Sequence, residues 1–199
     1  MNQANILAPV TLTNALARLE PLTQAHCTDL QETVGDLAGL WYTAIPTASN
    51  MASEIDRRLS LQAKGSMLPF AAINPATGKA VGMTTYMNID STHQRVEIGS
   101  TWTSTTMQRS GFNTACKHLL LQHAFETLEC IAVEFRTHRF NLQSRAAIER
   151  LGAQFDGMLR NHQRASNGSL RDTAVYSITA DEWSTVHAHL SFQMAKVHG

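Results

Sequence analysis

The residues best suited to chemistry form a short loop, residues 108–113 (QRSGFN), that leads directly into a long apolar helix pattern. A helix start exposes backbone N–H groups at the positive end of its dipole, so acidic side chains are favoured there. This start has none, because no Asp or Glu occurs from Ile98 to Phe125. The loop instead offers a glycine, an arginine and small polar residues, a set that can cradle a phosphate through its N–H groups.

Two common phosphate-binding motifs do not fit this loop. A P-loop requires GxxxxGK[ST], yet Phe112 and Asn113 follow Gly111, and a dinucleotide-binding fold requires GxGxxG after an early strand. An ordinary loop glycine is the alternative for Gly111, and a solvated loop side chain is the alternative for Arg109. The choice depends on the elements that surround the loop.

The bulk composition excludes several classes of protein. The 199 residues carry 16 basic and 16 acidic side chains, so no excess charge favours a nucleic-acid partner. Residues 1–20 show no signal-peptide pattern, and no apolar run reaches the ~20 residues of a membrane span. The three cysteines lack CxxC spacing, and His187 and His189 would point apart on a helix, so no metal site is expected. We therefore expect a soluble, cytoplasmic protein.

Turn residues, helix caps and hydrophobic periodicity predict a mixed α/β chain. Strands are expected at residues 11–20, 68–74, 80–90, 95–105, 131–137, 153–164 and 170–179. Helices are expected at residues 24–38, 49–63, 111–128, 141–151 and 181–196. The strand–helix–strand unit over residues 95–137 should be a right-handed crossover that makes a parallel strand pair. Residues 1–199 are expected to form a single domain with its core at about residues 11–179.

The loop resembles the Q/R-x-x-G-x-G/A signature with which the GCN5-related N-acetyltransferases (GNAT) bind the pyrophosphate of acetyl-CoA. VEIGSTWT (96–103) looks like the splayed fourth strand of that family. Other segments are similar to its ribosomal-protein alanine N-acetyltransferase branch (RimJ/RimL-like), namely LWYTAIP (40–46), NLQSRAAIERLGAQFDG (141–157) and DTAVYSI with the later EW. The sequence departs at Asn113, where most of the superfamily has Gly or Ala, but Asn accepts unusual backbone angles better than most residues.

The resemblance implies the GNAT fold, a mixed, mostly antiparallel sheet with a central splayed parallel βαβ unit and helices on both faces. It also implies acetyl transfer from acetyl-CoA to a primary amine by direct attack on the thioester. That reaction needs both reactants in line, a base for the ammonium proton and a donor for the developing oxyanion. The acceptor is either a protein N-terminus or a small amine, and the sequence does not choose. The alternative is a non-catalytic acyl-CoA-binding or regulatory module on the same fold.

Cofactor contacts are expected from the splayed strand, the loop and the two helix starts. The strand backbone would pair with the pantetheine arm and polarise the thioester carbonyl, and the loop would surround the pyrophosphate. By resemblance, Asn141 would contact the pantetheine and Ser144 would lie near the sulfur, with a helix cap and a surface serine as the alternatives. The expected cofactor-binding residues are Thr101, Trp102, Thr103, Gln108, Arg109, Ser110, Gly111, Phe112, Asn113, Asn141 and Ser144.

Glu97 is the preferred general base, because it lies on the strand that runs to the cofactor, between the apolar Val96 and Ile98. Burial would raise its pKa toward the useful range, whereas an outward-facing strand residue is the alternative. His138 is the second candidate base. Ser144 or water would protonate the leaving thiolate, because the tyrosine that often does so in the superfamily has no clear match here.

The acceptor site is expected between the first two helices and the final hairpin. Trp41 and Tyr42 are expected to bind the acceptor as part of its wall. Asp29, Glu32 and Asp36 share one helix face and could attract a cationic amine, although a solvated charged face explains them as well.

The terminal helix predicts association between copies of the chain. On one of its faces lie Trp183, Val186, Leu190 and Val197. Phe192 and Met194 fall largely outside that face and would be exposed unless another surface covers them. A homodimer involving this helix is therefore expected, and a helix that only covers its own sheet is the alternative.

Overall fold

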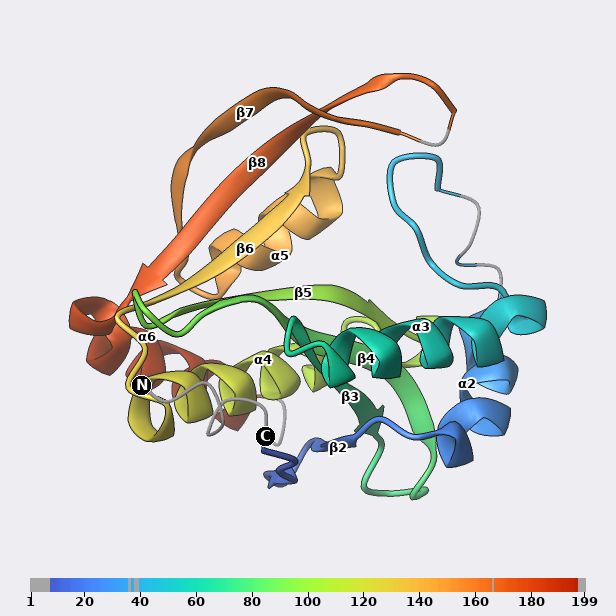
Figure 1. The fold of residues 1–199 in the computed structure, drawn as a ribbon. Coiled ribbons are helices and arrows are strands. Elements are labelled where there is room, and N and C mark those ends of the chain that lie inside the picture. Colours follow the sequence, from blue (N-terminus) through green and yellow to red (C-terminus); the bar gives the residue numbers. More distant parts are fainter. Residues whose placement is uncertain (1–7, 36, 38–39, 166, 197–199) are drawn as a thin grey trace.

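A computed structural model describes residues 8–35, 37, 40–165 and 167–196 (Figure 1). Its centre is an eight-stranded sheet in the order β1-β2-β3-β4-β5-β6-β8-β7. Among the described strands β5 and β6 run parallel, and the other neighbouring pairs are antiparallel. The strands are β1 (Leu12–Thr13), β2 (Arg18–Pro21), β3 (Met67–Ile73), β4 (Ala80–Asp90), β5 (Arg95–Thr103), β6 (Ala132–His138), β7 (Gln154–Arg164) and β8 (Leu170–Thr179). The predicted mixed fold with one parallel pair is confirmed.

Helices cover both faces of the sheet, as predicted. The helices are α2 (Cys27–Val34), α3 (Met51–Ala63), α4 (Phe112–Gln122), α5 (Leu142–Arg150) and α6 (Ala180–Ala195), with short turns η1 (Gln24–His26), η3 (Ala48–Asn50), η4 (Thr105–Met107) and η5 (His123–Thr127). We call the face covered by α2 and α3 the α3 face, and the face covered by α4, α5 and α6 the α4 face. No helix within the described residues is long and apolar enough to cross a membrane.

Each face of the sheet has its own hydrophobic core, because side chains alternate along the strands. On β4, Met83 joins the core of the α3 face, whereas Tyr86 joins that of the α4 face. On β5, Val96 and Ile98 point into the α4-face core, where α4 packs its apolar side. This alternation places the residue between them, Glu97, on the α3 face.

The parallel pair is short, and the two strands then part. Residues 95–97 of β5 pair with residues 132–134 of β6, and no pairing continues beyond them. Strand β6 goes on beside β8 as far as His138, while β5 stays with β4 as far as Thr103 (Figure 1). The facing backbone edges of both strands are therefore without a strand partner among the described residues, which is the splayed unit that the sequence predicted.

The first predicted strand and helix were both too long. Residues 11–20 form two short strands instead of one, because the Asn14 side chain accepts the N–H groups of Leu16 and Ala17 and turns the chain. The first helix begins as a 3-10 turn and ends at Val34, where Gly35 adopts a positive φ of 52°. The predicted end of that helix at residues 36–39 lies largely outside the described residues.

Smaller boundary errors have local causes. Helix α3 begins at Met51, and its N-cap residue is Asn50 instead of the predicted Ser49. The cause is the preceding 3-10 turn, around which Thr47 and Asn50 form a capping box. The helix predicted for residues 111–128 changes at His123 into a π-helical turn. The strand predicted for residues 95–105 ends at Thr103, before the turn η4.

The terminal helix partly differs from its prediction. Trp183, Val186 and Leu190 are buried as expected, but Met194 also packs partly against the α4-face core. Phe192 is 59% exposed, with the Lys196 ammonium 4.3 Å from its ring centroid, and Val197 lies outside the described residues. The second apolar side of α6 is thus smaller than predicted, and the homodimer stays a prediction.

Candidate active site

A β-bulge distorts β5 just after it leaves β6. Two residues of β5, Ser100 and Thr101, lie opposite the single residue Thr84 of β4. Ser100 has a positive φ of 46°, as expected for a residue forced out of a regular ladder. A bulge re-aims backbone groups that would otherwise be used in pairing, and this bulge lies where β5 no longer has β6 as a partner.

The helix start at α4 has the geometry of an anion site. Arg109 and Gly111 have positive φ angles of 62° and 80°, and Ser110 between them does not, an alternation typical of anion-binding backbone nests. Within the described chain, no backbone acceptor pairs with the N–H groups of Asn113 and Thr114. The first turn of α4 contains no acid. Four favourable features, the nest, the free N–H groups, the helix dipole and the missing carboxylate, thus meet at one point.

The predicted cofactor residues surround this splay in different ways. The side chains of Trp102 and Phe112 are buried in the α3-face and α4-face cores respectively, so only their backbone groups are available to a ligand. Thr101, Gln108 and Arg109 are exposed. Intermediate exposure is found for Thr103, Ser110, Gly111, Asn113, Asn141 and Ser144.

Glu97 is buried, with 5% of its surface exposed, at the last position where β5 still pairs with β6. Its Oε2 accepts a hydrogen bond of 2.6 Å from Asn88 Nδ2 and lies 3.6 Å from Arg136 Nε. Burial raises the pKa of Glu97, and the bond from Asn88 and the charge of Arg136 oppose that rise without cancelling it. The alternative of an outward-facing, solvated Glu97 does not match this burial.

The second carboxylate oxygen of Glu97 lies toward the bulge. A Cβ atom built on Gly99 would lie 3.0 Å from Glu97 Oε1 and 2.8 Å from Met87 Sδ. Within the described part of the chain no donor is bonded to Oε1. Because Gly99 has no side chain, there is room for Glu97 Oε1 beside it, just before the bulge. This oxygen is therefore available to accept a proton.

His138 ends β6 and is 3% exposed. Its Nδ1 lies 3.1 Å from the Phe140 backbone nitrogen and accepts that N–H group. The neutral ring must then carry its proton on Nε2, which is buried and has no partner among the described residues. Burial, assisted by Arg171, lowers the pKa of His138. In this geometry Nε2 is a hydrogen-bond donor, not a base.

The loop before η3 closes on His138 with two aromatic rings. The ring centroids of Trp41 and His138 are 5.1 Å apart, and those of Tyr42 and His138 are 6.0 Å apart. Phe140 stacks on His138 at 5.6 Å and also adjoins Trp41, with their ring centroids 6.1 Å apart. Trp41 and Tyr42 precede His138 by 97 and 96 positions in the sequence, and yet they contact it at the end of β6. Trp41 is still 53% exposed.

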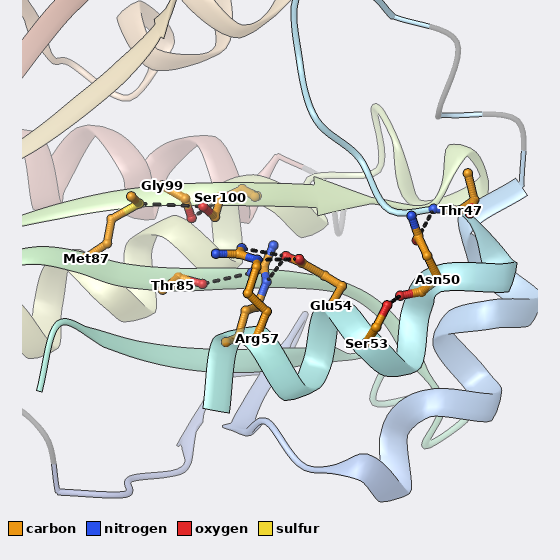
Figure 2. Close-up of polar contacts among 11 residues, drawn as sticks. Thr47, Asn50, Ser53, Glu54, Arg57, Thr85, Met87, Gly99 and Ser100 are labelled. Carbon is orange, nitrogen blue, oxygen red and sulfur yellow. Dashed lines mark hydrogen bonds and ion pairs between the residues drawn. The ribbon is translucent and has the colours of Figure 1, made fainter. Parts of the chain in front are cut away.

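The α3 face near the bulge carries a further charged group (Figure 2). Glu54 of α3 accepts hydrogen bonds from Arg57 and from the buried Arg58, and Arg58 Nη1 donates to Thr85 Oγ1 at 2.9 Å. Burial alone would raise the pKa of Glu54, but the two guanidinium groups hold it below the ordinary value. Figure 2 shows Glu54 on α3, on the side of the sheet where Thr85 and Met87 lie.

The start of α5 uses Asn141 as its helix cap. Asn141 Oδ1 accepts the Ser144 N–H at 3.0 Å, and this bond leaves the Ser144 hydroxyl free among the described residues. Tyr176 of β8, which the sequence did not single out, is bonded to Arg145 and Glu149 of the same helix. Its hydroxyl is therefore already engaged on both sides.

The acidic residues of the first helix and the histidines of the last helix have ordinary structural contacts where the structure describes them. Asp29 accepts the Ala80 N–H at 3.0 Å, and Glu32 pairs with Lys79 at 3.0 Å, while Asp36 lies outside the described residues. His189 lies 3.2 Å from a backbone oxygen of α5, and no group of three or more metal-ligating side chains occurs in the described ranges.

Sequence reasoning missed Lys117 of α4, which lies 6% exposed behind the bulge. Its Nζ is 2.6 Å from Thr101 Oγ1 and 3.1 Å from Thr84 Oγ1. The only available signal was a lysine at an inward position of a helix that is otherwise apolar there. A cavity of about 760 Å³ lies elsewhere, between α5 and α6, and none of the predicted site residues lines it.

Comparisons with known proteins agree with this geometry. A family model described as an acetyltransferase (GNAT) domain matches residues 17–154. YdaF of Bacillus subtilis (strain 168), provisionally named a ribosomal N-acetyltransferase, is 33% identical over 106 residues, which are 53% of this chain and 57% of YdaF. The chain thus spans little more than half the length of that relative.

Solved structures share the fold over nearly the whole chain. A GCN5-related N-acetyltransferase from Brucella melitensis superposes with a TM-score of 0.83 at 28% identity, covering 92% of this chain and 84% of that one. RimJ of Mycobacterium smegmatis, solved in complex with CoA-disulfide, superposes with a TM-score of 0.79 at 22% identity, covering 95% and 96%. The family match, the splayed strands and the acid-free helix start lead to one conclusion: the chain belongs to the GNAT acetyltransferase family.

Proposed function

We propose that the protein transfers the acetyl group of acetyl-CoA to the N-terminal amine of a protein or peptide, by direct attack in a ternary complex. One observation carries the proposal. Strand β5 parts from β6 immediately after the buried carboxylate of Glu97, so an acyl-binding slot and a basic group adjoin each other. The choice of a protein N-terminus rests on YdaF, whose name refers to ribosomal N-acetylation, and on the RimJ fold.

Acetyl-CoA would bind along the free edge of β5 and at the start of α4. Its thioester supplies the activated carbonyl that an amine attacks. The nest at residues 109–111 and the first N–H groups of α4 would hold the pyrophosphate, with Arg109 adding a positive charge. The backbone of residues 101–103 would pair with the pantetheine arm, and the bulge at Ser100 would present an N–H group to the carbonyl oxygen. RimJ, which shares the fold, was solved in complex with CoA-disulfide, and this supports a CoA compound as the ligand.

Glu97 would take the proton of the attacking ammonium. Its burial favours the protonated form, so the carboxylate is a stronger base than a solvated one. Asn88 and Arg136 hold Oε2, which leaves Oε1 to act directly or through one water molecule. A buried Glu97 beside the slot favours an enzyme over a non-catalytic acyl-CoA-binding module, for which no base at this point is needed.

His138 would serve the acceptor as a hydrogen-bond donor. Its Nε2–H has no partner among the described residues. In a peptide N-terminus, the Cα that carries the attacking amine also carries the first carbonyl group, whose oxygen can accept this N–H. Trp41 and Tyr42 would form the wall against which the first side chain lies. Ser144, whose hydroxyl is free, or water would return a proton to the departing thiolate.

The test is a CoA-release assay with acetyl-CoA and a matched panel of acceptors. The panel contains peptides with free N-terminal Ala, Ser or Met, the same peptides with the N-terminus blocked, and the small amines spermidine and lysine. Release with the free peptides alone, and acetylation of the α-amine in mass spectrometry, would support the proposal. Release with small amines alone would overturn the acceptor class, and acetyl-CoA binding without release from any acceptor would favour the binding module.

A further inference from the structure

The buried lysine behind the bulge has no acidic partner. Lys117 is the sixth residue of α4 and is 6% exposed, yet none of the ion pairs within the described ranges includes it. Its partners are two hydroxyl oxygens, Thr84 Oγ1 of β4 and Thr101 Oγ1 of β5. An ammonium group buried without a carboxylate destabilises a fold, so an apolar residue would suit this inward position better if packing were its only role.

The three side chains form a closed network at the bulge. Thr84 Oγ1 and Thr101 Oγ1 are 2.8 Å apart, and both accept from the same Nζ. Thr101 Oγ1 in turn donates to the Gly99 carbonyl at 3.3 Å, across Ser100. The network therefore holds the residues on both sides of the bulged residue and fixes them to β4 and to helix α4.

We propose that Lys117 is a positioning residue for acyl transfer, which holds the Ser100 bulge at a fixed place relative to the start of α4. Helix α4 would bind the pyrophosphate, and the bulge would present the N–H group to the thioester carbonyl. The distance between these two sites must match the length of the bound cofactor, and Lys117 links them with hydrogen bonds at one end of that path. This inference rests on the proposed function.

The surroundings of Lys117 explain why it can act through hydroxyl groups alone. Burial lowers the pKa of Lys117 to about 8, and the adjacent Cys116, whose own pKa is raised by burial to about 12, opposes this lowering. Strands β4 and β5 present threonines to it, and no acid occurs on α4. Near neutral pH the side chain is thus largely an ammonium with three donors, of which two are used by the threonines.

The test compares Lys117→Met with Cys116→Ala in the full chain. Methionine fills a similar volume without hydrogen bonds, and Cys116 is an adjacent buried side chain outside the network. For Lys117→Met we expect a melting temperature at pH 7 no lower than that of the wild type, and a kcat lower by about ten- to a hundred-fold, as for other misplaced reacting groups. The Kd for acetyl-CoA should stay within about three-fold, because the loss is confined to the transition state. Cys116→Ala should lose stability and keep its kcat.

Thr101→Val removes the shared hydroxyl and tests the network itself. The double variant Lys117→Met/Thr101→Val should be no slower than the slower single variant, since both break the same linkage. A Lys117→Met enzyme with a kcat within about two-fold of the wild type would overturn the inference. So would a loss of kcat that parallels a loss of stability, as for a purely structural residue.

A second measurement does not depend on turnover and separates this inference from the proposed function. Amide hydrogen exchange in the β4–β5 pairs that flank the bulge, Met83–Trp102 and Thr85–Gly99, should be about ten-fold faster in Lys117→Met and unchanged in Cys116→Ala. If wild-type protein turns over no acceptor, the proposed function fails and the exchange rates still decide the role of Lys117. Equal exchange at the bulge in wild type and Lys117→Met overturns the role of Lys117 whether or not the protein is active.

Discussion

A buried charged group lies on each face of β5, and the two have different partners. One is Glu97 of the strand itself, and the other is Lys117 of helix α4. On the α3 face Glu97 receives a hydrogen bond from Asn88 and lies near Arg136, so its charge is partly compensated. On the α4 face Lys117 meets only the hydroxyls of Thr84 and Thr101. Both groups lie next to the same bulge. Glu97 precedes it on β5, and Lys117 contacts Thr101, one of its two residues, from α4.

The difference separates two roles for a buried charge. The carboxylate has one constrained oxygen and one free oxygen, as a group that must exchange a proton requires. The ammonium directs its donors at fixed backbone-anchored side chains, as a group that must hold geometry requires. Burial moves the pKa of each toward neutrality, upward for Glu97 and downward for Lys117. Burial thus disfavours the carboxylate of Glu97 as the pH falls and the ammonium of Lys117 as the pH rises, so the two roles are separable by their pH dependence.

The largest expected effect comes from Glu97→Gln. A lost general base typically costs 10²–10⁴-fold, so we expect kcat at pH 7 to fall by about a thousand-fold, with acetyl-CoA affinity little changed. Because the base must be ionised, wild-type kcat should fall as the pH drops through the raised pKa of Glu97, and the variant should lack that limb. The loss should shrink at high pH, where the amine is already deprotonated.

Glu134→Gln is the matched control for that experiment. Glu134 is the register partner of Glu97 on β6, and its carboxylate pairs with Arg136 and Arg95. It loses the same charge beside the same arginine, and its kcat should stay within about three-fold. Equal losses in both variants would mean that the local charge matters and that Glu97 is not the base.

The stability of Lys117→Met should differ from wild type in a pH-dependent manner. The folded pKa of Lys117 is lowered from 10.5 to about 8, so between these values the unfolded chain binds a proton that the folded chain does not. Wild-type stability relative to the variant should therefore decrease by about 1.4 kcal/mol per pH unit as pH falls from 10 to 8, about 3 kcal/mol in total. Below pH 8 the difference should be constant.

Urea unfolding of both proteins at pH 7, 8, 9 and 10 measures this difference. Comparing the two proteins removes the contributions of Cys130 and Tyr86, whose pKa values are also raised by burial and which are present in both. A difference that does not change from pH 8 to pH 10 would show that Lys117 is not a buried ammonium, and the contrast with Glu97 would disappear.

The sequence predicted Glu97 and missed Lys117 for a physical reason. Glu97 lies between Val96 and Ile98 on a strand, where alternation leaves two possibilities, a buried side chain beside the cofactor or an outward-facing one. A lysine in a helix is ordinarily at the surface, because its long stem reaches water from many positions. Lys117 is buried because α4 packs against Thr84 of β4 and Thr101 of β5. The residues next to Lys117 in the sequence do not reveal this packing.

The same distinction explains the other outcomes. The order of helices and strands along the chain, the parallel pair and the glycine loop before α4 follow from spacing and turn chemistry within short segments, and they were predictable. The contact between Trp41 and His138 joins residues far apart in sequence, and the orientation of the His138 ring depends on the Phe140 N–H. The sequence could name these residues, but it could not determine which ring nitrogen is free.

Gly111→Asp tests the cofactor end of the α4 face. The position has a φ of 80°, and a carboxylate there would repel the pyrophosphate that the nest is proposed to bind. Gly111→Asn has the same shape and tolerates this φ, so it isolates the charge. We expect the Asp variant to bind acetyl-CoA at least about ten-fold more weakly than the Asn variant in calorimetry. Equal affinities in the two folded variants would remove the phosphate from this helix start.

The smallest expected effect is that of Trp41→Ala on the acceptor side. Trp41 is 53% exposed and contacts His138 and Phe140, so its removal leaves the buried core intact and opens the proposed acceptor wall. We expect the KM for a peptide acceptor to rise by about three- to ten-fold, the cost of one partly buried contact, while the KM for acetyl-CoA stays unchanged. Ile131→Ala is the control, because Ile131 is equally exposed and lies at the other end of β6, before the strands part. A parallel rise of both KM values in Trp41→Ala would place Trp41 in the support of the slot, and the acceptor would then have to be sought nearer to Arg57 on α3.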